Sequence, residues 1–318
     1  MLAFLFVWIK SEIIAKIFMT LKFENLVVVP YTCGWERKIM MIIFYKSVMW
    51  LMQVLAKLLN MFIKLPSGVK LLKNVKYGEL YKQKFDIYYN HKRKVKSIMF
   101  FVHGGGFISG DKLFYKGFCG KLSSMGYMVI NINYTLAPKS DSCKMVKDVV
   151  CAVEKSIDTI KPKKFCKKII FAGDSAGTMI VFKAYEKLKS SGKLLFYKTG
   201  LVGFYGVYNL EWFNESLFPY KDLFITSIDT DIKFDNCLAL TKKSDGEPIL
   251  LVSGEVDKLH KNQTIPIINE YTKLGYNVNS FILDKSFSSG FHGFLAYRNN
   301  KATKLMPEIV DKFIETSV

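Results

Sequence analysis

Short apolar runs alternate with segments of helical period from about residue 70 to the carboxyl end of the chain. Runs 75–81 and 84–89 predict a β-hairpin, because the second alternates apolar and polar residues. The further predicted strands are 97–102, 127–132, 168–172, 200–204, 248–252 and 278–283. The segments with helical period are 143–157, 178–187, 262–274 and 302–314. The central strands are apolar throughout, which is typical of parallel strands that helices cover on both faces.

This order of elements predicts an α/β fold, with a mostly parallel eight-stranded sheet and helices on both faces. Ligands of such sheets bind at the carboxyl ends of the strands. Candidate chemistry is therefore sought directly after each strand.

The amino-terminal residues 1–69 have a different pattern and are interpreted as a separate apolar segment. Met1–Ile9 is apolar but too short to span a bilayer. Within 40–64, polar residues recur at intervals of three, four or seven, which predicts an amphipathic helix with a narrow polar edge. Such a helix either lies in a membrane interface or packs on the catalytic domain as a cap, and the pattern leaves both open.

Residues 70–318 are interpreted as one catalytic domain, because no repeat or Pro/Gly/Ser-rich linker divides them. Segment 211–247 lacks a strand pattern and is rich in aromatic residues. It is predicted to form a small cap, with a surface loop insertion as the alternative.

The net charge is +19, from 46 Lys and Arg against 27 Asp and Glu. Only three of the basic residues are arginine, the side chain that reads bases and phosphates bidentately, and the lysines are spread along the chain. We therefore expect no nucleic-acid partner. Positive charge on the polar edge of helix 40–64 favours peripheral contact with an anionic membrane, so the expected location is membrane-associated or cytoplasmic. The six cysteines lack the spacing of a zinc site or a disulfide framework.

The segment 173–177 has the sequence GDSAG and lies between a predicted strand and a predicted helix. G-x-S-x-G in that setting is a sharp turn that presents a serine nucleophile, here Ser175. The strand 97–102 ends in a second turn, His103-Gly104-Gly105-Gly106. Backbone N–H groups of such a turn, together with that of Ala176, can stabilise the oxyanion of a tetrahedral intermediate.

A serine nucleophile needs a base, and the chain has four histidines. His91 precedes the central strands, His103 lies on the oxyanion side, and His260 follows the candidate acid too closely. His292 lies in a glycine-flanked loop after the last strand, and it is the predicted base. For the acid that orients it, Asp257 after strand 248–252 is preferred to Glu255, with Asp284 third.

The order Ser175, Asp257, His292 is that of α/β-hydrolases. The chain resembles the hormone-sensitive-lipase-like esterase family over about residues 70–318. The matching motifs are HGGG at 103–106, NYTLAP at 133–138, GDSAG at 173–177, the Asp257 turn and HGF at 292–294. Two positions depart from the family, since Thr135 stands where arginine is usual and Thr178 where glycine is common.

The resemblance implies an α/β-hydrolase fold and a serine carboxylester hydrolase that needs no cofactor and no metal. In that family Gly105 and Gly106 donate to the oxyanion with Ala176, and Gly104 is included in the predicted oxyanion hole. The expected substrate is a small or lipid-like apolar acyl ester. Two alternatives stay open, an amidase or deacetylase with the same triad and a non-catalytic ligand-binding module on the same fold.

Overall fold

The computed structural model describes residue 54 and residues 63–137, 139–162, 166–212, 238–296 and 300–318. All of these belong to the unit Gln53–Val318, and the unit Met1–Met52 lies outside the described residues. Most of the amphipathic helix predicted over 40–64, and the centre of the cap predicted over 211–247, also lie outside them. Both stay predictions, as does the membrane contact of the amino-terminal segment.

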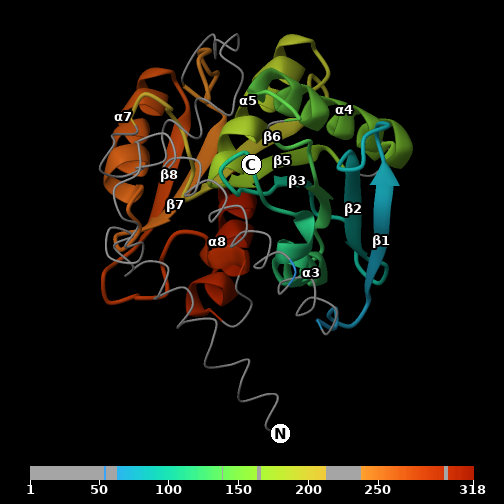
Figure 1. Cartoon of the computed structure of the whole chain (residues 1–318). Coiled ribbons are helices and arrows are strands. Elements are labelled where there is room, and N and C mark those ends of the chain that lie inside the picture. Colours follow the sequence, from blue (N-terminus) through green and yellow to red (C-terminus); the bar gives the residue numbers. More distant parts are fainter. Residues whose placement is uncertain (1–53, 55–62, 138, 163–165, 213–237, 297–299) are drawn as a thin grey trace, which may run out of the picture. The chain divides into compact units, whose positions relative to one another are not determined.

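Eight strands form one sheet in the order β1-β2-β4-β3-β5-β6-β7-β8 (Figure 1). The strands are β1 Val69–Lys76, β2 Lys84–Asn90, β3 Ile98–Val102, β4 Met128–Ile132, β5 Lys168–Asp174, β6 Lys198–Phe204, β7 Pro248–Gly254 and β8 Asn277–Leu283. The pairs β1/β2 and β2/β4 are antiparallel, and all other pairs are parallel. The predicted fold, a mostly parallel eight-stranded sheet, is confirmed.

The first strand of the hairpin lies earlier than predicted, at Val69–Lys76 instead of 75–81. Residues 77–83 instead turn the chain back: the Gln83 N–H donates to the Leu80 carbonyl, and the Gln83 side chain accepts from the Leu80 N–H. These two hydrogen bonds close a turn over residues that the sequence pattern assigned partly to a strand.

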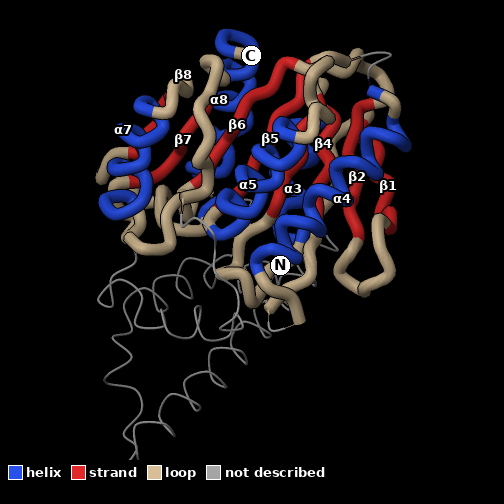
Figure 2. Tube along the Cα trace, turned by 90° about the horizontal axis from the view of Figure 1, so that it is seen from above, coloured by secondary structure: helices blue, strands red, loops and turns tan. Residues whose placement is uncertain are grey.

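Helices cover both faces of the sheet (Figure 2). The helices are α3 Lys116–Ser124, α4 Ser142–Ile160, α5 Ala176–Ser190, α7 Ile265–Lys273 and α8 Lys301–Ser317. Alternate residues of a strand point to opposite faces, so Phe100 packs with α4 and α5, whereas Phe101 packs with α3 and α8. The sequence pattern missed α3, because its two glycines interrupt the helical period.

The carboxyl ends of the parallel strands carry the loops in which chemistry was sought. The glycine turn follows β3, Ser175 follows β5, Asp257 follows β7 and His292 follows β8. Neighbouring parallel strands place these loops at one edge of the sheet.

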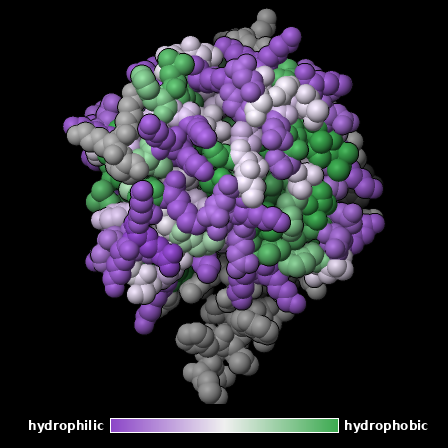
Figure 3. Space-filling model, turned by 180° about the vertical axis from the view of Figure 1, so that it is seen from behind, coloured by the Kyte–Doolittle hydropathy of each residue, from purple (hydrophilic) through white to green (hydrophobic). Residues whose placement is uncertain are grey.

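Within the described residues, every helix is too short or too polar to cross a membrane. Hydrophilic side chains spread over the face shown in Figure 3, with hydrophobic side chains visible between them. Residues 238–240, at the end of the segment predicted as a cap, return to the core: Asn209 and Leu238 form a β-bridge, and Ala239 and Leu240 are buried.

Candidate active site

Ser175 lies in a sharp turn between β5 and α5. Its backbone has φ 49° and ψ −125°, a conformation that a residue with a side chain rarely adopts. Three hydrogen bonds hold it: the Ser175 N–H donates to the Phe204 carbonyl at 3.0 Å, and its own carbonyl accepts from the N–H groups of Val207 at 3.0 Å and Thr178 at 3.1 Å. The surrounding backbone therefore maintains the strained turn that presents the side chain.

A chain of two hydrogen bonds connects Ser175 to a carboxylate. Ser175 Oγ lies 2.9 Å from His292 Nε2, and His292 Nδ1 lies 3.0 Å from Asp257 Oδ2. Asp257 is buried, and its other oxygen accepts from the Leu259 N–H at 2.8 Å. A carboxylate beside Nδ1 favours the tautomer with the proton on Nδ1, which leaves Nε2 free to accept the serine proton.

The other acids considered from the sequence are not in contact with His292. Glu255 accepts from the backbone N–H of Lys285 at 3.1 Å, and Asp284 accepts from Ser286. Both bonds are on the exposed surface. Asp257 is the acid that the structure brings to His292.

The remaining histidines have partners elsewhere. His91 Nδ1 lies 2.7 Å from the Gly68 carbonyl, and His260 Nδ1 lies 2.7 Å from Ser253 Oγ. His103 is fully buried, stacks on Tyr134 and contacts its neighbour's carbonyl. Burial lowers the pKa of His103 to about 4, so its imidazole is neutral near pH 7.

Close backbone approach brings the His292 loop to the Asp257 turn. A Cβ on Gly254 would lie 2.0 Å from the Gly290 carbonyl oxygen, so only glycine fits where the two segments cross. The crossing explains how a base 35 residues from its acid in sequence reaches it in space.

The glycine turn after β3 lies directly against Ser175. A Cβ on Gly104 would be 2.9 Å from the Ser175 Cβ. The Gly104 N–H donates to Asp174 Oδ1 at 2.6 Å, so the prediction that Gly104 belongs to the oxyanion hole is wrong: its donor is already committed. Within the described part of the chain, the N–H groups of Gly105, Gly106 and Ala176 have no backbone hydrogen-bond partner.

Sequence reasoning missed a buried group next to the serine. The Asp174 carboxylate accepts from Gly104 N–H, from Tyr115 Oη at 2.8 Å and from Tyr205 Oη at 3.0 Å. Burial raises the pKa of Asp174 to about 6, although these donors oppose the rise. Nothing in the sequence connects Asp174 to tyrosines 59 and 31 residues away.

Electrostatics prepare His292 to take a proton. Burial by itself would lower the pKa of His292, but the charge and hydrogen bond of Asp257 outweigh it and raise that pKa above its ordinary value of 6.5. The imidazole still keeps 31% of its side-chain surface accessible, so a substrate can approach it.

Thr178, a departure from the resembling family, fits its place on α5. Its hydroxyl donates to the Gly173 carbonyl at 2.8 Å. Its methyl group occupies space left by two glycines, since a Cβ at Gly203 or Gly206 would lie 3.0 or 2.8 Å from it. Thr135, the other departure, donates its backbone N–H to Asp148 at 2.9 Å.

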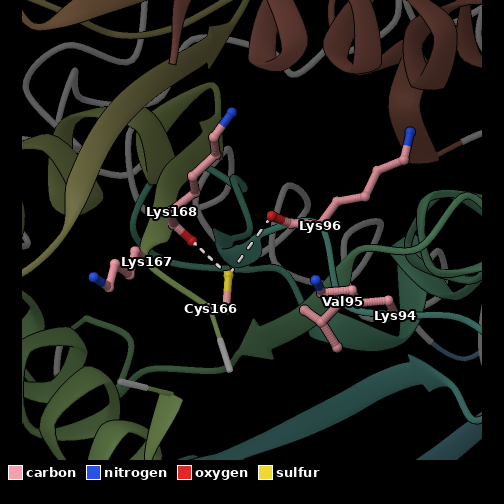
Figure 4. A pocket seen from close by; sticks show the side chains of 6 residues that line it. All are labelled: Lys94, Val95, Lys96, Cys166, Lys167 and Lys168. Carbon is pink, nitrogen blue, oxygen red and sulfur yellow. Dashed lines mark hydrogen bonds between the residues drawn. The ribbon is translucent and has the colours of Figure 1, made fainter. Parts of the chain in front are cut away.

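A cavity of about 360 Å³ lies at the opposite end of the sheet, beside the amino ends of β3 and β5 (Figure 4). It is lined by Lys94, Val95, Lys96, Cys166, Lys167 and Lys168. The ammonium groups of Lys96 and Lys168 point toward the top of Figure 4 and that of Lys167 to the left. The Cys166 thiol donates to the carbonyls of Lys96 and Lys168. Burial raises the pKa of that thiol, so it is not an activated nucleophile.

Comparison with known proteins agrees with this fold. The family model described as alpha/beta hydrolase fold matches residues 99–266. A similar solved structure is esterase B from Lactobacillus rhamnosis, with a TM-score of 0.73 at 17% identity, covering 89% of this chain and 96% of that one. A hormone-sensitive lipase from a metagenome library has a TM-score of 0.64 at 20% identity, covering 86% and 98%. A bacterial heroin esterase has a TM-score of 0.67 at 17% identity, covering 86% and 91%.

The family match spans more than half of the chain and includes Ser175, and the whole fold is shared with these solved structures. The resemblance that the motifs carried is confirmed, and the chain belongs to the alpha/beta hydrolase fold family.

Proposed function

We propose that this protein is a serine carboxylester hydrolase with Ser175 as nucleophile, His292 as general base and acid, and Asp257 as the residue that orients the imidazole. The observation that carries the proposal is the unbroken pair of hydrogen bonds from Ser175 through His292 to Asp257. The strained serine turn and the glycine loop beside it support the same reaction.

In the first half of the reaction, Ser175 Oγ bonds to the ester carbonyl carbon while His292 Nε2 takes its proton. The N–H groups of Gly105, Gly106 and Ala176 donate to the carbonyl oxygen as it becomes negative. The bond to the alcohol oxygen then breaks, and His292 returns the proton to that oxygen. Water repeats the sequence on the acyl-enzyme, giving its proton to His292 and releasing a carboxylic acid and the free serine.

The proposed substrate is a small or lipid-like ester with an apolar acyl group. Esterase B from Lactobacillus rhamnosis, which shares the fold, has been crystallised after inhibition by a tributyrin phosphonate. A phosphonate of this kind imitates the tetrahedral intermediate on a serine. Because the triad can also cleave amides, the test below compares the two bond types.

The test is hydrolysis of p-nitrophenyl esters of increasing acyl length by the purified protein, with p-nitroanilides of the same acyl groups in parallel. Alkyl phosphonate should inactivate the enzyme at one equivalent, with the adduct on the peptide that contains Ser175. Faster hydrolysis of the anilides than of the esters would mean that the protein is an amidase and not an esterase. Absence of both hydrolysis and adduct would reject a catalytic function and favour a ligand-binding module.

The pH dependence of hydrolysis follows from the shift of His292. Only the neutral imidazole can accept the serine proton, so kcat/KM should fall about tenfold per pH unit below the pKa of His292. Asp257 raises that pKa, which places the acid limb above pH 6.5. Measuring kcat/KM over roughly pH 5 to 9 checks the position of the limb. Asp257→Asn removes the negative charge and should move the limb to lower pH; a limb that stays in place would show that another group controls it.

A further inference from the structure

A buried carboxylate joins three elements of the candidate site. The two oxygens of Asp174 accept hydrogen bonds from the Gly104 N–H in the oxyanion loop, from Tyr115 at the end of η2 (Lys112–Tyr115) and from Tyr205 after β6. Asp174, Tyr115 and Tyr205 are each at most 4% exposed. Hydrogen bonds to a buried carboxylate are stronger than those between neutral groups, so this cluster is a rigid junction.

Tyr205 extends the junction to the loop that carries the base. Its hydroxyl donates to Asp174 and accepts from the Leu295 N–H at 3.2 Å. Its ring meets the imidazole of His292 edge to face, with 5.0 Å between ring centroids, and that of Phe294 at 4.8 Å. One side chain thus contacts the Asp174 junction, His292 and the two residues Phe294 and Leu295 that follow it in the same loop.

The backbone of Tyr205 is held in an unusual conformation. Its φ is 38°, in the left-handed region, and its N–H donates to the Val252 carbonyl at the end of β7. A bulky residue in this region costs free energy, and such outliers persist where the surrounding structure requires them. With this conformation the chain leaves the carboxyl end of β6 so that the Tyr205 ring lies between Asp174 and the His292 loop.

We propose that Tyr205 is a positioning residue that couples the oxyanion loop to the base loop through Asp174. It holds the imidazole edge, the serine turn and the N–H donors in one arrangement, so that nucleophile, base and oxyanion hole are aligned at the same time. The inference rests on the proposed function, because alignment is defined by the reaction that it serves.

The size of the effect follows from how alignment enters catalysis. A displacement of about 1 Å in a reacting group can cost about 10²-fold in rate. Loss of the Tyr205 hydroxyl leaves both a buried Asp174 oxygen and the Leu295 N–H with one partner fewer. Both loops can then shift while the triad residues themselves are unchanged.

The test is Tyr205→Phe, which keeps the ring against His292 and removes the hydroxyl. We expect kcat for p-nitrophenyl ester hydrolysis to fall roughly 10- to 100-fold, with KM within about twofold of the wild type. Tyr208→Phe is the matched control: Tyr208 is equally buried in the same loop, and within the described residues its hydroxyl bonds to neither Asp174 nor the His292 loop. Its kinetics should equal those of the wild type.

A second readout separates positioning from a general loss of stability. The chain has four histidines, so the imidazole of His292 can be followed through a pH titration by NMR with labelled histidine. The groups that face it are Ser175, Asp174, Tyr205 and Asp257, and both carboxylates raise its pKa. Tyr205→Phe and Asp174→Asn should each lower the pKa of His292, whereas Tyr208→Phe should leave it unchanged.

Wild-type kcat and an unshifted His292 titration in Tyr205→Phe would overturn the inference, as would an effect confined to KM. If Tyr205→Phe does not fold, Asp174→Asn carries the test with the same two expectations, because it keeps the side-chain size, removes the negative charge and replaces one of the two acceptor oxygens by an NH2 donor. Failure of the proposed function is distinguishable: the wild type would then lack hydrolysis, while the titration of His292 would still report the coupling.

Discussion

Replacing Ser175 by alanine is expected to lower kcat/KM for p-nitrophenyl ester hydrolysis by about 10⁴- to 10⁶-fold. The substitution removes the oxygen that forms the acyl-enzyme in the proposed mechanism, and His292 then has no serine proton to accept. The residual rate comes from the oxyanion donors and from substrate binding, which the substitution leaves in place. The measurement is the initial rate against substrate concentration, together with loss of the phosphonate adduct.

A matched control for this prediction is Ser253→Ala. Ser253 and His260 form a second serine–histidine pair, with 2.7 Å between Oγ and Nδ1. Both residues are buried, and His260 meets the proposed triad through its backbone, whose N–H donates to the Asp257 carbonyl at 3.1 Å, so the Ser253 hydroxyl is the group to remove. The variant should keep kcat/KM within about tenfold of the wild type. Near wild-type activity in Ser175→Ala would contradict the mechanism, and its collapse in Ser253→Ala alone would move the nucleophile to that pair.

Asp257→Ala is expected to lower kcat by about 10³- to 10⁴-fold. Without the carboxylate, Nδ1 loses its acceptor, and the imidazole can take the tautomer whose Nε2 already carries a proton. The substitution also removes the negative charge that compensates the imidazolium during the reaction, and because the site is buried, water does not replace that charge. Steady-state kinetics near pH 8, with circular dichroism to verify folding, measure the loss.

Glu255→Ala is the matched control for the assignment of Asp257 as the acid. Glu255 lies two residues away on the same turn, and its carboxylate bonds to the Lys285 backbone at the surface. Its removal should change kcat less than about threefold. A larger loss in Glu255→Ala than in Asp257→Ala would reverse the assignment of the acid.

The sequence predicted the parallel strands closely, since the apolar runs 97–102, 168–172 and 248–252 lie within β3, β5 and β7 or extend them by one residue. Strands buried on both faces must be apolar throughout, so their pattern is independent of what packs on them. The sequence pattern did not predict the position of the hairpin turn or the helix α3, because both depend on contacts of particular side chains. The hairpin turn depends on hydrogen bonds of Gln83, and α3 is stabilised by burying Phe118 and Leu122 although its glycines oppose a helix.

In the candidate site, Ser175, His292 and Asp257 could be selected from the sequence because each follows a recognisable strand. Asp257 and Glu255 lie two residues apart, and the structure places the Asp257 carboxylate beside His292, whereas Glu255 bonds to the backbone of Lys285. The structure also corrected the role of Gly104. A glycine motif predicts free N–H groups, but only the fold shows that Asp174 takes one of them.

The sequence by itself determined which predicted strand each candidate residue follows and which residue types form the candidate triad. Both depend on short-range patterns along the chain. Only the tertiary structure decided which groups hold the triad in place. Tyr115, Asp174 and Tyr205 are brought together because η2, β5 and the end of β6 meet at one edge of the sheet. Hydrogen bonds between residues far apart in sequence leave no periodicity in the chain, so this part of the site becomes visible only when the strands are side by side.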